Sequence, residues 1–170
     1  ELCGWPEPTG VIATNDAEAL LALDADCVCY TAQGETRMPA AIADLCRILA
    51  SGKNVASTSM VALVYPPAAS PRMVERLRSA CEQGQTSFFT SGFDPGFSGD
   101  LIPLAMAACC ERVDSVRVSE LMDYSRYEDP GFTGVFFGYG RPLDYDAPLF
   151  RPGMLRGGWG PMVRMLADAF

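Results

Sequence analysis

The sequence predicts an α/β fold built around a parallel sheet, and three observations support this prediction. Apolar segments typical of strands alternate with amphipathic segments of helical period through residues 1–90. The connections are long enough for the crossovers that parallel strands require. The chain has 170 residues, of which 49% are hydrophobic and 20% charged, and this composition fits one globular domain or two small ones.

Strands are expected where short apolar runs are bounded by turn residues. The second such run, residues 27–30, is continuously apolar, which predicts a strand buried on both faces. The four expected strands of the first part cover residues 10–14, 27–30, 54–57 and 86–90.

A helix is expected after each of the first three strands. Asn15 can cap the first helix, because Glu18 follows at the spacing of a capping box. Pro39 suits the start of the second helix and Gly52 its end. The third helix is expected over residues 71–84, after Ser-Pro and up to a glycine.

The regular alternation ends at residue 90, and we expect a domain boundary near Ser91 that separates residues 1–90 from residues 91–170. A Gly-rich turn opens the second part, and a helix over 101–110 and a strand over 113–123 should follow. A final helix is expected over 161–170. Between these elements lies a stretch rich in Gly, Pro and aromatic residues, which indicates loops and irregular strands lining a cleft or a subunit contact. Its bounds are 124–160, and its aromatic residues include Phe132, Phe136, Phe137, Tyr139 and Trp159.

The charged residues exclude several classes of function. Thirteen basic against 21 acidic residues give a net charge of −8, and no basic patch compensates, so no nucleic-acid partner is expected. The chain has no histidine, which excludes Ser-His-Asp and Cys-His nucleophilic sites and His-ligated zinc. Proton transfer must therefore use carboxylates, Tyr, Cys, water or Lys53, the only lysine.

The seven cysteines form no Cys-x-x-Cys motif and lie mostly in apolar runs, as small buried residues do in a reducing compartment. Cys27 and Cys29 share a face of the expected strand, where they are interpreted as packing residues and not as metal ligands. No metal site, membrane span or signal peptide is predicted, so we expect a soluble cytoplasmic protein. The remaining cysteines are Cys3, Cys46, Cys81, Cys109 and Cys110.

Small and hydroxylic residues follow three of the expected strands, at Thr31-Ala32, Ser57-Thr58-Ser59 and Ser91-Gly92. In doubly wound sheets, ligands bind outside the carboxyl ends of the strands. Such residues let a backbone approach a flat ligand closely, although they serve ordinary turns equally well. The strand ends therefore predict a ligand site with a structural alternative.

Acidic side chains gather where the second part begins. The turn over residues 91–100 presents Asp94 and Asp100, and Asp100 can also serve as the N-cap of the helix that follows. In the strand expected from residue 113, side chains alternate between two faces, which puts Glu120 on the same face as Val116 and Val118. Glu120 then lies either at a solvated strand end or in a site. Asp123 and Tyr124 follow at once, so carboxylates and a phenol come together.

Several stretches together resemble a known family. They are Ala25-Asp26-Cys27-Val28-Cys29-Tyr30-Thr31-Ala32, Gly52-Lys53-Asn54-Val55-Ala56-Ser57-Thr58, and above all Ser91-Gly92-Phe93-Asp94-Pro95-Gly96-Phe97, then Asp100-Leu101, Glu120 and Asp123. This pattern resembles the dihydrodipicolinate reductase-like oxidoreductases, and within them the 2,4-diaminopentanoate dehydrogenase type. The resemblance covers most of residues 10–145.

The resemblance implies an enzyme that uses NAD or NADP, with a Rossmann domain whose C-terminal part is residues 1–90. Residues 91–170 would belong to an α+β domain that binds a small-molecule substrate and builds a homo-oligomer, a dimer or a tetramer. The resemblance also implies roles for single residues. Near the cofactor, Thr31 and Ala32 would border it, Ser57 and Thr58 would lie near the nicotinamide, and Gly92, Asp94 and Pro95 would join the domains beside it. Near the substrate, Glu120 and Asp100 would hold a cationic amine or iminium, and Tyr124 would move a proton.

The sequence departs from this family in two ways. True dihydrodipicolinate reductases carry a His-rich motif and a catalytic Lys in the second domain, and this chain has neither, so a role in lysine biosynthesis is not expected. The Gly-x-Gly-x-x-Gly fingerprint and the strands on either side of it are also absent. Those strands would fill the centre of the sheet, between 11–14 and 27–30, and without them two strand edges stay unpaired. We therefore expect that Glu1 is not the natural start, or that the sheet is completed in another way.

The leading hypothesis from the sequence is an oxidoreductase that transfers hydride to or from the C–N carbon of a small amino-acid-like substrate or a diamine. One alternative is a non-catalytic module that retains the fold and binds a ligand or a partner. Another is a carbonyl reductase of the same fold.

Overall fold

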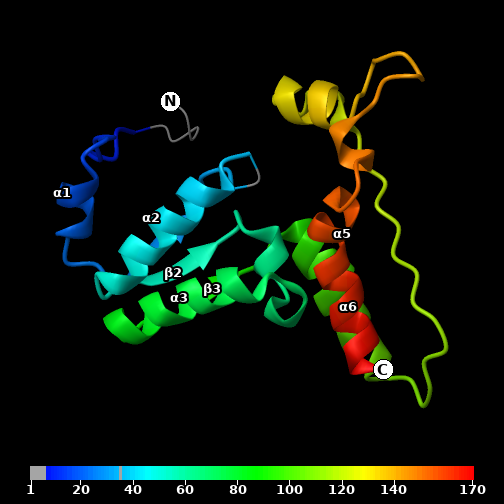
Figure 1. Cartoon of the computed structure of the whole chain (residues 1–170), viewed down its shortest axis with the longest axis horizontal. Helices are drawn as coiled ribbons and strands as arrows, with labels where there is room; N and C mark the ends of the chain where they lie inside the picture. Colours follow the sequence, from blue (N-terminus) through cyan, green and yellow to red (C-terminus); the bar gives the residue numbers. More distant parts are fainter. Residues whose placement is uncertain (1–6, 35) are drawn as a thin grey trace.

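The structure is a computed structural model that describes residues 7–34 and 36–170. Its only sheet in the described part has three strands, β1 (Cys27–Tyr30), β2 (Asn54–Ser57) and β3 (Phe88–Thr90), in the order β1-β2-β3. Both pairings are parallel, so the expected α/β fold with a parallel sheet is confirmed (Figure 1). β3 is two residues shorter than the strand expected over 86–90.

Helices α2 (Met38–Ala50) and α3 (Pro71–Gly84) run beside the sheet and pack on each other, as predicted from their periodicity (Figure 1). Pro39 lies in the first turn of α2, and Gly52 follows its end with a φ of +89°. The buried apolar residues of this layer form one cluster: Tyr30, Ala41, Ile42, Leu45, Leu49, Val55, Met60, Leu63, Leu77 and Ala80.

Gly84 is required by the close approach of α2 to α3. A Cβ at this position would lie 1.9 Å from the backbone oxygen of Leu49, which no side chain tolerates. The residue in the left-handed region is the next one, Gln85, with a φ of +55°. The glycine predicted as the end of α3 therefore serves the packing of two helices.

The sheet has one covered face, which corrects two expectations. Along β2 the burial alternates, with Val55 and Ser57 buried and their neighbours exposed. Cys27 and Cys29 lie on the open face and are exposed, so β1 is not buried on both faces. Among the other cysteines, two are half-buried and two exposed, which contradicts the expected burial. The half-buried pair is Cys46 and Cys81, the exposed pair is Cys109 and Cys110, and Cys3 lies outside the described residues.

The expected strand over residues 10–14 does not form. Val11 and Ile12 are 84% and 87% exposed, and the segment pairs with no strand of the described chain. A strand needs a neighbour for its backbone hydrogen bonds, and none lies beside it here. The helix that follows is α1 (Ala17–Leu21), and its cap is Asp16, whose Oδ1 accepts from the backbone N–H of Ala19 at 3.0 Å. Asn15 was therefore the wrong cap by one residue.

After β3 the chain forms the wide helical turns of η3 (Phe93–Leu101), whose backbone is non-helical from Asp94 to Gly96, and then α4 (Ile102–Ala107). The helix is shorter than the expected 101–110. Residues 113–123 are extended but belong to no sheet of the described chain, so the expected strand there is also wrong. This segment runs apart from the sheet (Figure 1).

The last part consists of short turns and helices, and irregular strands are absent from residues 124–160. α6 (Gly160–Ala169) agrees with the expected final helix and packs against η3 and against the turns after β2. The hydroxyl of Tyr65, in those turns, donates to Oδ2 of Asp168 on α6 at 2.8 Å. No helix over the described residues is long and apolar enough to cross a membrane. The other elements are η1 (Val61–Leu63), η2 (Pro66–Ala68), η4 (Tyr124–Arg126), η5 (Gly131–Phe136), η6 (Pro148–Phe150) and α5 (Met154–Gly158).

Candidate functional site

A cleft of about 590 Å³ lies beside the carboxyl ends of β1 and β2. The turns after these strands, the start of η3, residues from η5 and its approach, and the α5 segment all contribute to its walls. The lining residues are Thr31, Gln33, Met38, Thr58, Ser59, Val61, Ala62, Asp94, Pro95, Tyr127, Asp129, Phe132, Phe136, Gly153, Met154, Gly157, Gly158 and Trp159.

Of the residues predicted at the strand ends, the structure brings Thr31 and Thr58 to this cleft. Ala32 is exposed and does not line it. Ser57 is buried under the sheet, where its Oγ accepts from the backbone N–H of Ser59 at 3.0 Å. Ser59, which follows in the same turn, lines the cleft instead of Ser57.

The turn after β3 contributes Asp94 and Pro95 to the cleft. Gly92 is not part of the lining, and it shapes the turn instead. A Cβ on Gly92 would lie 2.7 Å from the backbone oxygen of Pro95, and its own carbonyl accepts from the N–H of Phe97 at 2.9 Å. Only a residue without a side chain fits this close approach.

Asp94 has a neighbour at each carboxylate oxygen. The indole Nε1–H of Trp159 donates to its Oδ2 at 3.1 Å. Its Oδ1 lies so close to Gly99 that a Cβ there would approach it to 2.9 Å. The same Cβ would lie 1.8 Å from Sδ of Met162, so Gly99 is the point where α6 and Asp94 meet.

Asp100 is 2% exposed, and its Oδ2 has no hydrogen-bond partner among the described residues. Its Oδ1 accepts from the N–H of Leu101 at 2.5 Å. Burial raises the pKa of Asp100 and the charge of Asp94 adds to the rise, while the backbone N–H opposes it. The expected N-cap role is wrong, because Asp100 lies within the turns of η3 and α4 begins after Leu101, without a side-chain cap.

Glu120 and Tyr124 complete the group of predicted residues. Tyr124 donates its hydroxyl to Oε1 of Glu120 at 3.4 Å. Partial desolvation raises the pKa of Glu120, and a hydrogen bond with Asp94 and the charge of Asp94 raise it further. The pKa of Tyr124 is also raised, by desolvation first and by the charge of Glu120 second.

Asp94, Asp100 and Glu120 thus form a carboxylate cluster in which each of the other two feels the charge of Asp94. In the described part of the chain, none of the three takes part in an ion pair, although six other acidic residues do. Neighbouring carboxylates without a basic partner favour protons or a bound cation. Of these residues Asp94 lines the cleft, whereas Asp100, Glu120 and Tyr124 are not part of its lining. A cationic group at this edge of the cleft would therefore contact Asp94.

The far wall of the cleft is aromatic, as the composition of residues 124–160 indicated. Phe132, Phe136 and Trp159 line it, together with Tyr127, which sequence reasoning missed. Phe137 and Tyr139 do not line the cleft. They support the wall from behind, since Phe137 packs edge-on against Phe132 at a centroid distance of 4.6 Å and stacks on Tyr139 at 5.2 Å. Rings of this kind pack against apolar groups, and their faces attract cations.

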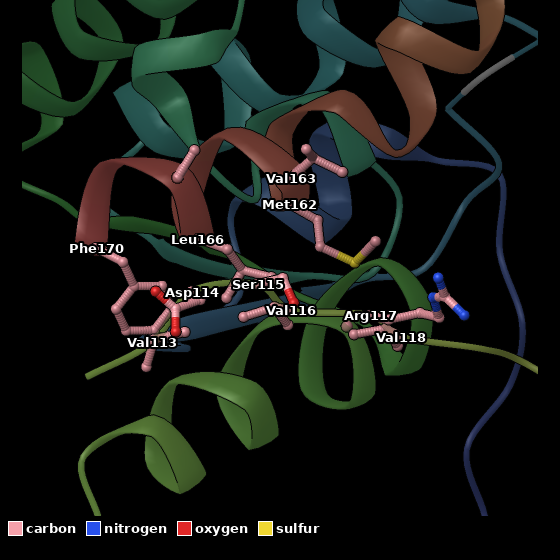
Figure 2. Close-up of a pocket in the computed structure, with 12 residues that line it drawn as sticks. Val113, Asp114, Ser115, Val116, Arg117, Val118, Met162, Val163, Leu166 and Phe170 are labelled. Atoms are coloured by element: carbon pink, nitrogen blue, oxygen red, sulfur yellow. The ribbon is translucent and has the colours of Figure 1, made fainter. Parts of the chain in front are cut away.

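A second cavity, of about 500 Å³, lies between α6 and the extended residues 113–118 (Figure 2). Its walls are mostly apolar and include Met162, Leu166 and Phe170 of the last helical segment. None of the site residues predicted from the sequence lines it. Gly99, which lies next to Asp94, borders this cavity and is not part of the lining of the cleft.

Comparison with known proteins yields one informative relative. A curated protein named amine dehydrogenase, from Streptomyces virginiae, is 36% identical to this chain over 160 residues. The match covers 94% of this chain and 44% of the relative, so the chain spans less than half the length of the protein it matches. No family model matches the sequence. No solved structure matches it either.

Proposed function

We propose that this chain is part of an NAD(P)-dependent oxidoreductase that transfers hydride to or from the C–N carbon of an amine or imine. The observation that carries the proposal is the carboxylate cluster of Asp94, Asp100 and Glu120 beside a cleft at the carboxyl ends of parallel strands. The relative named amine dehydrogenase supports the same reaction class. We further propose that the sheet is part of a Rossmann-type domain of the dihydrodipicolinate reductase-like family.

The residues at the strand ends fit the nicotinamide end of a dinucleotide. Thr31, Thr58 and Ser59 offer hydroxyl donors and acceptors along one side of the cleft. Gly34 packs directly against the turn that carries Ser59, since a Cβ there would lie 2.2 Å from the backbone oxygen of Ser59. A bound nicotinamide supplies a carbon that accepts or donates hydride. The hydroxyl residues would hold its polar edge.

The carboxylate cluster would act on the nitrogen of the substrate. Ionised Asp94 and Glu120 favour an ammonium or iminium over the neutral form, because opposite charges attract strongly in a partly desolvated site. The hydroxyl of Tyr124, which touches Glu120, is positioned to pass a proton between Glu120 and water. The aromatic wall of Tyr127, Phe132 and Phe136 would hold the apolar part of the amine.

A turnover assay tests this proposal. The full-length protein that contains this chain is incubated with NAD or NADP and a panel of amines that includes benzylamine and a diamine, and formation of the reduced cofactor is measured. We expect turnover with at least one amine, and an Asp94→Asn variant should lose most of it. Asp146→Asn is the matched control, since Asp146 is an exposed carboxylate paired with Arg151, outside the cleft.

Two other outcomes favour the alternatives. Binding of benzylammonium without cofactor binding or turnover would support a non-catalytic module that keeps the fold. Turnover with simple alcohols or ketones but with no amine or imine would support a carbonyl reductase. Binding of neither cofactor nor amine by the full-length protein that contains this chain contradicts the proposal.

A further inference from the structure

Trp159 lies at the junction of α5 and α6, and we propose that it is a positioning residue for the carboxylate cluster. Its indole N–H donates to Oδ2 of Asp94, 65 residues earlier in the chain, and its ring lines the cleft. The hydrogen bond therefore ties the start of α6 to the turn after β3. The inference rests on the proposed function only for the chemistry of the ligand, an organic ammonium ion.

The contacts of Asp94 hold its carboxylate in one orientation. Oδ2 holds the indole N–H, and Oδ1 lies against the backbone of Gly99, on which Met162 of α6 also packs. Rotation of the carboxylate would separate Oδ2 from its donor and press an oxygen against Gly99. In the orientation that results, Asp94 reaches Glu120, whose pKa it raises.

A neutral donor suits this position better than a cation would. The indole N–H stabilises the ionised carboxylate without cancelling its charge, so the charge stays available to an ammonium ligand. The other titratable groups that face Asp94 or the cleft are Asp100, Glu120, Tyr127 and Asp129. Because Asp100 and Glu120 both feel the charge of Asp94, the pH dependence of binding is described by the apparent midpoints of the cluster and not by one residue.

Binding of benzylammonium to the full chain as a function of pH tests the inference. The dissociation constant is measured by NMR between about pH 4 and pH 8 for the wild type and for Trp159→Phe, which keeps a ring and removes the N–H. We expect the acid-side midpoint of binding to rise in Trp159→Phe, because the variant loses a hydrogen-bond donor to a carboxylate of the cluster.

Tyr65→Phe is the matched control. It also removes a hydrogen bond from an aromatic residue to an aspartate, here Asp168 on α6, but far along the helix from the cleft. This variant should lose a similar amount of thermal stability and leave the binding midpoint where it is in the wild type. Equal losses of stability in the two variants with an unchanged midpoint in both would overturn the inference, since Trp159 would then be merely structural.

A measurement without ligand separates this inference from the proposed function. The indole N–H resonance that disappears in Trp159→Phe is followed through an acid titration of the wild type. We expect an inflection that Asp94→Asn abolishes, whether or not benzylammonium binds. Lack of benzylammonium binding would contradict the proposed function alone, whereas an inflection that persists in Asp94→Asn would overturn the role of Trp159.

Discussion

The layer of the sheet with α2 and α3 differs from residues 111–158 in what its side chains do. The layer, together with Met60 and Leu63 of the turn after β2, supplies the buried cluster between Tyr30 and Ala80. In residues 111–158, Ala147 and Leu149 are the buried apolar residues, while the region holds Glu120, Tyr124 and most of the aromatic wall. Stability and proposed chemistry therefore lie in different parts of the chain, and the cleft is where they meet.

The largest effect is expected in the layer. Leu45 is fully buried between α2 and its neighbours, so Leu45→Ala should lower the free energy of unfolding by about 3 kcal/mol. Leu143, in the other region, is fully exposed, and Leu143→Ala should change it by less than about 0.5 kcal/mol. Urea denaturation followed by circular dichroism measures both. Equal losses would mean that the second region carries as much stability as the layer.

Substitution of Glu120 should have the opposite character, with a large effect on turnover and a small one on stability. Glu120→Gln removes one charge of the cluster, and we expect kcat/KM for an amine substrate to fall about 100-fold. Its melting temperature should stay close to that of the wild type because Glu120 is exposed. Asp114→Asn is the control, since Asp114 is an exposed carboxylate paired with Arg112. A similar loss in the control would contradict a specific role of Glu120.

Asp100 makes the free energy of unfolding depend on pH in the acidic range. Its pKa is raised in the folded state, so the folded protein binds a proton that the unfolded chain releases above its usual value of 3.8. The free energy of unfolding contributed by Asp100 should therefore fall as the pH rises from that value through the raised one, and then stay constant. The difference between wild type and Asp100→Asn, measured by urea denaturation across this window, should change with pH in that sense. A difference independent of pH would contradict the raised pKa.

The smallest effect is expected on the outer surface of α3. Arg78 and Glu75 form an exposed pair one helical turn apart, at 3.4 Å. Glu75→Gln should lower the free energy of unfolding by less than about 0.5 kcal/mol, because water and salt screen such pairs. Thermal denaturation at low and high salt measures it. A loss as large as that of Leu45→Ala would show that the layer depends on its surface charges.

Periodicity was sufficient to predict the elements of the layer. β1, β2, α2 and α3 lie where the apolar runs and amphipathic segments indicated, since these patterns report which side of an element is buried. The rule that ligands bind at the carboxyl ends of parallel strands predicted Thr31 and Thr58 near one site, and both line the cleft. Asp94 and Pro95, which the family resemblance placed beside them, line it too. Local pattern and topology were both informative here.

The same patterns could not reveal which neighbours are present. The short apolar run at 10–14 and the alternation in 113–123 predict strands, but they do not show whether a partner strand lies alongside. The exposure of Cys29 follows from an uncovered sheet face, which no feature of its own segment reports. The bond from Trp159 to Asp94 joins residues 65 positions apart, so no short motif could indicate it.

The separation of Asp94, Glu120 and Trp159 along the chain also sets the order in which the molecule can fold. The buried cluster closes short loops between adjacent helices and strands, whereas the site must bring together three distant segments and pay a larger entropy of loop closure. Amide hydrogens of α2 and α3 should therefore exchange more slowly than those at the α5–α6 junction. On refolding, helical structure should return first, and the contact between Trp159 and Asp94 should form only when α6 has docked.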